Sequence, residues 1–150
     1  MALDLECTLT FTIRAMTASL TIQQTADAFG LSVHTLRYYE RVGLIKPVAR
    51  GSNGHRLYRA EDLGWIEFLL RLRATGMSVE KMQRYAHLRE TGKRLSSVSE
   101  RKAMLQQHSL VVEAELKALN ETLAYLHEKI VLYSRMEEEL KAEESENEKH

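Results

Sequence analysis

Apolar positions recur at the spacing of short amphipathic helices from residue 21 onward. In TIQQTADAFG (21–30), Thr21 is followed three residues later by Gln24, a capping box, and Gly30 ends the apolar period. The arrangement repeats in LSVHTLRYYERVG (31–43), where Ser32 is the predicted cap and a glycine again ends the pattern. Two short helices separated by a glycine turn predict a helix-turn-helix.

A turn-rich segment follows the second helix. Pro47 prevents the helix from continuing, and short extended pieces at 48–49 and 56–58 flank the turn-forming run RGSNG. This pattern predicts a small β-hairpin, the wing that accompanies many DNA-binding helix-turn-helix units.

Three further helices are predicted after the wing. The first runs from near Glu61 to Gly76, and the second is capped by Ser78 and stops near Gly92. The third begins near Val98 and carries positions that alternate by four and three residues, eight of the nine being apolar: Leu105, Ser109, Val112, Leu116, Leu119, Leu123, Leu126, Ile130 and Tyr133. This repeat is typical of a coiled-coil seam, which needs a partner helix.

The predicted organisation is mainly α-helical and has four parts. Residues 1–19 form a disordered arm, 20–94 the winged helix-turn-helix domain, 95–136 the dimerisation coil and 137–150 an acidic disordered tail. The first convincing cap follows Met16, so either Met1 or Met16 could be the true start.

Charge is divided unevenly along the chain, although the total is zero. Residues 1–94 carry 14 Lys and Arg against 9 Asp and Glu, whereas residues 95–150 carry 7 against 12. Within 34–59, six basic residues accompany Glu40 as the single acid. A basic head joined to an acidic remainder suggests a nucleic-acid partner for the head.

The second helix of a helix-turn-helix enters the major groove of DNA. Its N-terminal residues lie nearest the base edges, and Arg37 and Arg41, four apart, share a face that can neutralise phosphates. Tyr38 adds a phosphate donor, and Arg50, Arg56, Tyr58 and Arg59 extend this surface through the wing. The alternative is a protein–protein module in which the leucine seam alone is functional, but it leaves the basic 34–59 patch unexplained.

Three segments together resemble the MerR family of bacterial transcriptional regulators: TIQQTADAFGLSVHTLRYYERVGLI, GHRLY and EDLGWIEFLLRLRATGMSVEKM. The resemblance covers about residues 21–92. It implies a winged-helix DNA-binding domain joined to a long antiparallel dimerising helix. It also implies a homodimer that bends and untwists promoter DNA, at a pseudo-palindromic site, until RNA polymerase can engage it.

The resemblance also assigns residues that face DNA, namely Arg37, Tyr38 and Arg41 in the recognition helix and Arg56 and Tyr58 in the wing. The full predicted DNA-binding set is Thr21, Ser32, His34, Thr35, Arg37, Tyr38, Arg41, Arg56 and Tyr58. The predicted dimer interface comprises Leu105, Val112, Leu116, Leu119, Leu123, Leu126 and Ile130. His55 stands where the family often has Tyr.

The sequence leaves the controlling signal open. Metal-sensing members use cysteines near the dimerisation helix, and this chain has none after Cys7, so no metal site is expected. A subgroup that responds to aldehydes or nitrosative stress uses a thiol in the helix after the wing, where this chain has Arg71. A small ligand could instead lie near Trp65, Met77, Met82 and Tyr85, although such residues are more often plain core.

Other classes fit less well. No phosphate loop, partnered nucleophile or carboxylate pair is present, so neither catalysis nor a cofactor is expected. A single cysteine, no signal peptide and no bilayer-length apolar run predict a cytoplasmic protein without a membrane partner. An architectural DNA-bending protein of excisionase type is the alternative function, but such proteins are usually much shorter than this chain.

Overall fold

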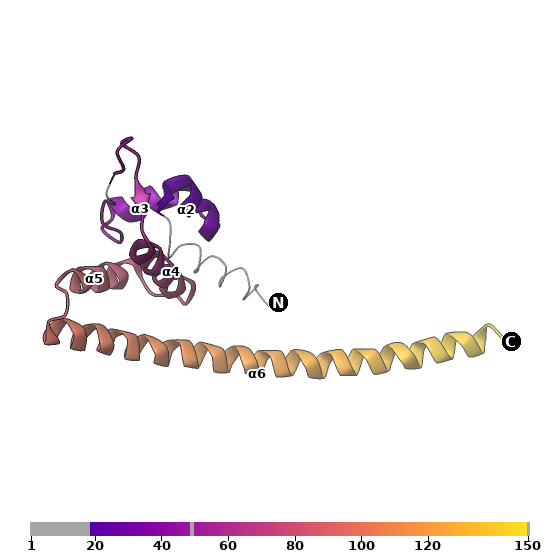
Figure 1. Cartoon of the computed structure of the whole chain (residues 1–150). Coiled ribbons are helices and arrows are strands. Elements are labelled where there is room, and N and C mark those ends of the chain that lie inside the picture. The colour runs from indigo at the N-terminus through magenta and orange to yellow at the C-terminus, as the bar shows by residue number, and fades with distance from the viewer. Residues whose placement is uncertain (1–18, 49, 150) are drawn as a thin grey trace. The chain divides into compact units, whose positions relative to one another are not determined.

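A computed structural model of the chain describes residues 19–48 and 50–149 and divides after Met104 into two units. Figure 1 shows the elements. The first unit contains the strands β1 (Leu20–Thr21) and β2 (Leu57–Tyr58), the helices α2 (Ile22–Phe29), α3 (Val33–Arg41), α4 (Ala60–Ala74) and α5 (Val79–Glu90), and the start of α6 (Leu95–Asn147). The second unit is the rest of α6, so the protein is mainly helical.

The predicted helix-turn-helix is confirmed in α2 and α3. Thr21 Oγ1 accepts a hydrogen bond from the Gln24 amide at 3.2 Å, and Gln24 Oε1 accepts one from the Thr21 amide at 3.0 Å. Ser32 Oγ accepts from the Thr35 amide at 3.1 Å and so starts α3. Between the helices, Gly30 has a φ of 64°, a left-handed conformation that glycine adopts without steric cost.

The predicted wing differs in its pairing. The antiparallel sheet joins β1 to β2, with Leu20 opposite Tyr58 and Thr21 opposite Leu57. Val48 lies in no strand, and Ala49 is outside the described residues. The wing tip is closed instead by an isolated bridge between Arg50 and Arg56 and by the Gly51 amide, which donates to the His55 carbonyl at 2.7 Å.

The strand β1 was not predicted, because two residues are too few to show an alternating pattern. Leu20 directly precedes the helix cap at Thr21, so no sequence pattern distinguishes it as part of a strand. The expectation of a disordered arm concerns residues that lie, except for residue 19, outside the described part of the chain, and so do Cys7 and Met16.

The core of the first unit lies between α2, α3, α4 and α5. The largest of its side chains that are less than 2% exposed are Tyr58, Leu36, Ile66, Leu69, Met82 and Thr25. The rings of Trp65 and Tyr85 stack at 5.9 Å with an interplanar angle of 15°. The four residues considered for a small ligand, Trp65, Met77, Met82 and Tyr85, are all buried, so they pack as core.

The long helix α6 is longer at both ends than predicted. It begins at Leu95 and continues to Asn147, so the expectation of a disordered tail at 137–150 is wrong over nearly all of that segment. Acidic composition suggested disorder, but Glu, Ala, Leu and Lys are all strong helix formers. A Glu137–Lys141 ion pair at 2.6 Å, one helical turn apart, adds local support.

Within the described residues, no helix combines the length and the apolar character needed to cross a membrane.

Candidate nucleic-acid interface

The recognition helix α3 has two distinct faces. Leu36 and Tyr39 are buried at 0% and 3% exposure. His34, Arg37, Tyr38 and Arg41 are exposed. These four recur at intervals of three, one and three residues and therefore share the opposite side of the helix. This division explains the adjacent tyrosines: Tyr39 belongs to the core and Tyr38 to the surface.

An arginine accompanies each of the two tyrosine rings. The guanidinium of Arg73 in α4 lies 5.8 Å from the centre of the Tyr39 ring and also donates a hydrogen bond to its hydroxyl. These contacts fix α3 against α4. On the exposed face, Arg41 lies 5.6 Å from the centre of the Tyr38 ring, so a positive charge is held beside an aromatic surface.

The single acid of the basic patch is turned toward the wing. Glu40 Oε2 lies 2.8 Å from Arg56 Nη1, and the two side chains are only 12% and 28% exposed. That oxygen accepts no hydrogen bond of good geometry, so the contact is an ion pair held by charge. Its effect is to tie the base of the wing to α3 and to remove most of the negative charge from the exposed surface. Arg56, predicted to face DNA, is half-buried and has its charge paired.

The predicted DNA contact of Tyr58 is wrong. Its side chain is 0% exposed and belongs to the core, and burial is the main reason that its pKa is raised above the ordinary 10.0. Neighbouring residues of a strand point to opposite faces, and in β2 the residue turned inward is Tyr58. A two-residue strand does not reveal from its sequence which face is inward.

A cavity of about 310 Å³ lies between α2, α3 and the wing. It is lined by Thr21, Ile22, Arg37, Arg50, Gly54, His55 and Arg56. Arg37 from α3 and Arg50 and Arg56 from the wing thus converge beside the N-terminus of α2, whose free amides favour a negative charge. The arrangement fits a phosphate group. Arg50 was predicted only to extend the basic surface through the wing, and no DNA contact was predicted for His55.

The remaining predicted residues lie at the start of α3. Ser32 and His34 are exposed and Thr35 is half-buried. The hydroxyls of Ser32 and Thr35 lie 3.0 Å apart, so both are engaged in the helix cap while His34 projects freely toward solvent. The structure therefore groups Thr21, Arg37 and Arg56 around the cavity, and Ser32, His34 and Thr35 at the helix tip.

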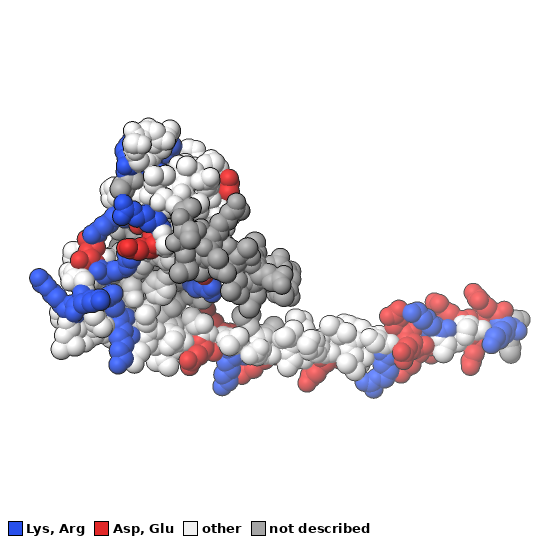
Figure 2. Space-filling model, viewed as in Figure 1, with Lys and Arg blue, Asp and Glu red and all other residues white. Residues whose placement is uncertain are grey.

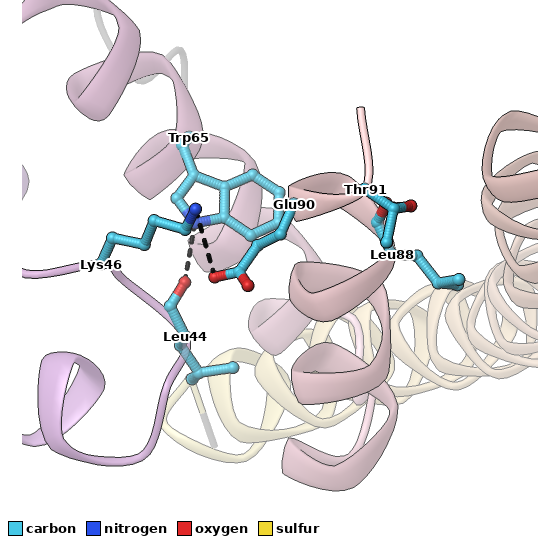
Figure 3. Close-up of polar contacts among 6 residues, drawn as sticks. All are labelled: Leu44, Lys46, Trp65, Leu88, Glu90 and Thr91. Carbon is cyan, nitrogen blue, oxygen red and sulfur yellow. Dashed lines mark hydrogen bonds and ion pairs between the residues drawn. The ribbon is translucent and has the colours of Figure 1, made fainter. Parts of the chain in front are cut away.

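The segment that leaves α3 is attached to α4 and α5 (Figure 3). Trp65 Nε1 donates to the Leu44 carbonyl at 2.7 Å, and Lys46 Nζ lies 3.6 Å from a carboxylate oxygen of Glu90. Two residues before Leu44, the Val42 carbonyl accepts a hydrogen bond from Gln83 Nε2 at 2.8 Å. These contacts fix the position of the exposed face of α3. They could not be predicted from a local sequence pattern, because the partners are distant in the chain.

Charge on the surface follows the division seen in the sequence. Figure 2 shows Lys and Arg side chains gathered on the unit that contains α3, whereas Asp and Glu crowd the C-terminal end of α6. Among the described residues, no three His, Cys, Asp or Glu side chains are close enough together to hold a metal ion. A wing, a capped helix pair and an exposed basic face define a winged helix-turn-helix protein of the DNA-binding class.

The comparison with known families makes the class specific. Residues 20–100 match the family described as MerR HTH family regulatory protein. The chain belongs to this family, whose relatives and structural neighbours are transcriptional regulators rather than enzymes.

Two individual relatives are also transcriptional regulators by name. The regulator AdhR of Bacillus subtilis is 48% identical over 86 residues, which are 57% of this chain and 60% of AdhR. An HTH-type transcriptional regulator of Haemophilus influenzae is 30% identical over 115 residues, which are 77% of this chain and 84% of the relative.

Two solved structures are similar over most of the chain. HiNmlR, a MerR family regulator lacking the sensor domain and bound to promoter DNA, has a TM-score of 0.70 at 29% identity and covers 78% of this chain and 91% of its own. A MerR family transcriptional regulator from Listeria monocytogenes has a TM-score of 0.74 at 34% identity and covers 86% and 99%.

Proposed function

We propose that this protein binds promoter DNA as a homodimer and regulates transcription by changing the shape of that DNA. The observation that carries the proposal is the outer face of α3, where His34, Arg37, Tyr38 and Arg41 are exposed while the opposite face is locked into the core. The crystal structure of HiNmlR with promoter DNA supports it, since that protein is similar to 78% of this chain.

In the proposed complex, α3 lies in the major groove with its N-terminus toward the base edges. His34 reaches the bases from the helix tip, and Arg37 and Arg41 neutralise phosphates along the groove. Another phosphate of the DNA backbone occupies the cavity lined by Thr21 and Arg50. Contacts to phosphates set orientation and affinity, whereas His34 contributes to the reading of sequence.

The dimer is proposed from α6. Its seam residues Leu116, Leu119, Leu123, Leu126 and Ile130 are between 49% and 67% exposed in the single chain, which is unusual for leucines at regular spacing. Pairing two such helices would bury them and join two DNA-binding heads. The dimer then holds both heads on one distorted duplex, and RNA polymerase engages the reshaped promoter. A 53-residue helix favours this over the excisionase alternative.

The test is the salt dependence of DNA binding. Arg37→Ala with Arg41→Ala should weaken binding to every duplex and lower the slope of log K against log salt by about 2, since each lost phosphate contact contributes about 0.9. The matched control is Lys117→Ala with Arg135→Ala, which removes the same charge from exposed positions of α6. Equal slopes for the two double variants would show that α3 does not contact the phosphates.

A further inference from the structure

The apolar seam of α6 extends beyond the segment that defined it. Counting by four and three from Leu105 toward the N-terminus reaches Lys102, Val98 and Leu95; counting from Tyr133 toward the C-terminus reaches Glu137 and Leu140. All lie within the single helix α6. Leu95 is 82% exposed, Val98 43% and Leu140 57%. Apolar side chains thus stand uncovered at both ends of the seam, 45 residues apart.

We propose that a second copy of this chain covers these ends in one specific antiparallel register, with Leu140 of each protomer packed against the partner's Leu95. This inference rests on the homodimer of the proposed function and adds the alignment of its two helices. In an antiparallel pair, the residue numbers of any two residues that face each other have the same sum. For Leu95 opposite Leu140 this sum is 235, and it identifies the register. The two-fold axis then lies midway between Leu116 and Leu119, which face each other across it.

This register pairs apolar positions with each other at the ends and in most of the central layers, although Ser109 lies opposite Leu126. Leu105 lies opposite Ile130, and Val112 lies opposite Leu123. Shifting one helix by a heptad toward a sum of 242 would instead place the half-buried Leu105 against Glu137 and the exposed Leu95 against Asn147, so two leucines would meet polar side chains. A shift the other way, to 228, would leave Leu140 beyond the first residue of the partner's α6.

The two charged seam positions also favour the proposed register. Lys102 lies opposite Tyr133, and Glu137 lies opposite Val98 in the adjacent layer, so the ammonium and the carboxylate are diagonal neighbours across the interface. In the 228 register, Lys102 would lie against Leu126 with no seam acid in an adjacent layer. A charge buried in an interface without a partner is strongly unfavourable.

The terminal charges complement each other in the same alignment. Residues 137–148 carry seven glutamates and one lysine. The proposed register lays this segment beside the start of the partner's α6, where Lys93 and Arg94 are exposed. Opposite charge at the two ends would therefore favour the antiparallel over the parallel arrangement, in which the acidic segments would lie side by side. We call this contact, between the acidic residues 137–148 of one protomer and Lys93 and Arg94 of the other, the clasp.

The register can be read directly from cysteine pairs in a Cys7→Ser background. Leu95→Cys with Leu140→Cys tests 235, Leu95→Cys with Tyr133→Cys tests 228, and Lys102→Cys with Leu140→Cys tests 242. Mild oxidation, or a short bismaleimide, should give covalent dimer at least tenfold faster for the first pair than for the other two. Each single-cysteine variant should remain uncrosslinked; efficient crosslinking of a single variant would indicate a parallel pair.

Sedimentation of the unmodified chain separates the possible failures. A dimer whose fastest crosslink is one of the other two pairs would overturn the register but keep the homodimer. A monomer at micromolar concentration would overturn the homodimer itself. Salt provides a second measurement: a truncation after Met136 should weaken the dimer most at low salt, because the charges it removes are then least screened. A truncation that leaves dimer affinity unchanged at every salt concentration would also contradict the clasp.

Discussion

The clearest consequence of the seam is that two leucines near its centre should decide whether the protein dimerises. Leu119 and Leu123 are 67% and 49% exposed in the single chain, so most of their apolar surface remains to be buried by a partner. Replacing both with Ala should dissociate the dimer while leaving α6 helical, because Ala has the highest helix propensity of all residues.

The magnitude follows from the exposed fractions. Fully burying a Leu side chain stabilises by about 2 kcal/mol, so the exposed parts of Leu119 and Leu123 correspond to about 1.3 and 1.0 kcal/mol. A symmetric dimer contains each residue twice, and the expected loss is on the order of 4 kcal/mol, roughly a thousandfold in the dissociation constant. Any cavity left between the helices would add to this loss.

Sedimentation velocity over a concentration series is the assay, with helix content checked by circular dichroism. The matched control is Leu110→Ala with Leu132→Ala, which removes two leucines that are 65% and 39% exposed on the same helix but outside the seam spacing. If the control dissociates as readily as the seam variant, or if the seam variant keeps the parental dissociation constant, Leu119 and Leu123 do not hold the dimer together.

Three further predictions concern the head. Trp65→Phe keeps an aromatic ring beside Tyr85 but removes the donor to the Leu44 carbonyl, so the free energy of unfolding in urea should fall by about 1–3 kcal/mol; an unchanged value would mean that the carbonyl finds another donor. Arg56→Met leaves the poorly exposed Glu40 carboxylate unpaired and should destabilise by a similar amount, about 1–3 kcal/mol, whereas Glu40→Gln added to it should restore part of the loss. Burial raises the pKa of Tyr58 above 10.0, so at alkaline pH the folded state keeps a proton that the unfolded chain releases. The free energy of unfolding is therefore full below about pH 10 and declines as the pH rises toward the folded-state pKa. In denaturant titrations, Tyr58→Phe should show a smaller decline between about pH 9 and 11, and an equal decline would show that another group causes the alkaline loss.

Local signals in the sequence predicted the helical part of the head well. The caps at Thr21 and Ser32 and the stop at Gly30 each depend on residues within one helical turn, so they can be predicted without knowledge of the fold. The same holds for the exposed leucine seam, because a heptad repeat shows directly which side of a helix is apolar.

Contacts between distant segments were not predictable in this way. The strand β1 exists only because β2, 37 residues later, pairs with it. In the sequence, Glu40 is the single acid in a basic segment. In the structure it forms an ion pair with Arg56 between α3 and the wing, and this contact is not apparent from the sequence. Tyr58 carried the residue type expected of a DNA contact, but its direction is set by the sheet and the core beneath it. Composition misled at 137–147, where acidic side chains proved compatible with a helix.

In the proposed dimer, two DNA-binding heads, each presenting the exposed face of α3, bind one duplex together. Selection of bound sites from a library of random duplex DNA by the full chain tests it most directly. We expect enrichment of two inverted half-sites whose centres lie on one face of the duplex, separated by a multiple of about 10 base pairs. Enrichment of a single half-site without dyad symmetry, or recovery of unselected sequence, would contradict it.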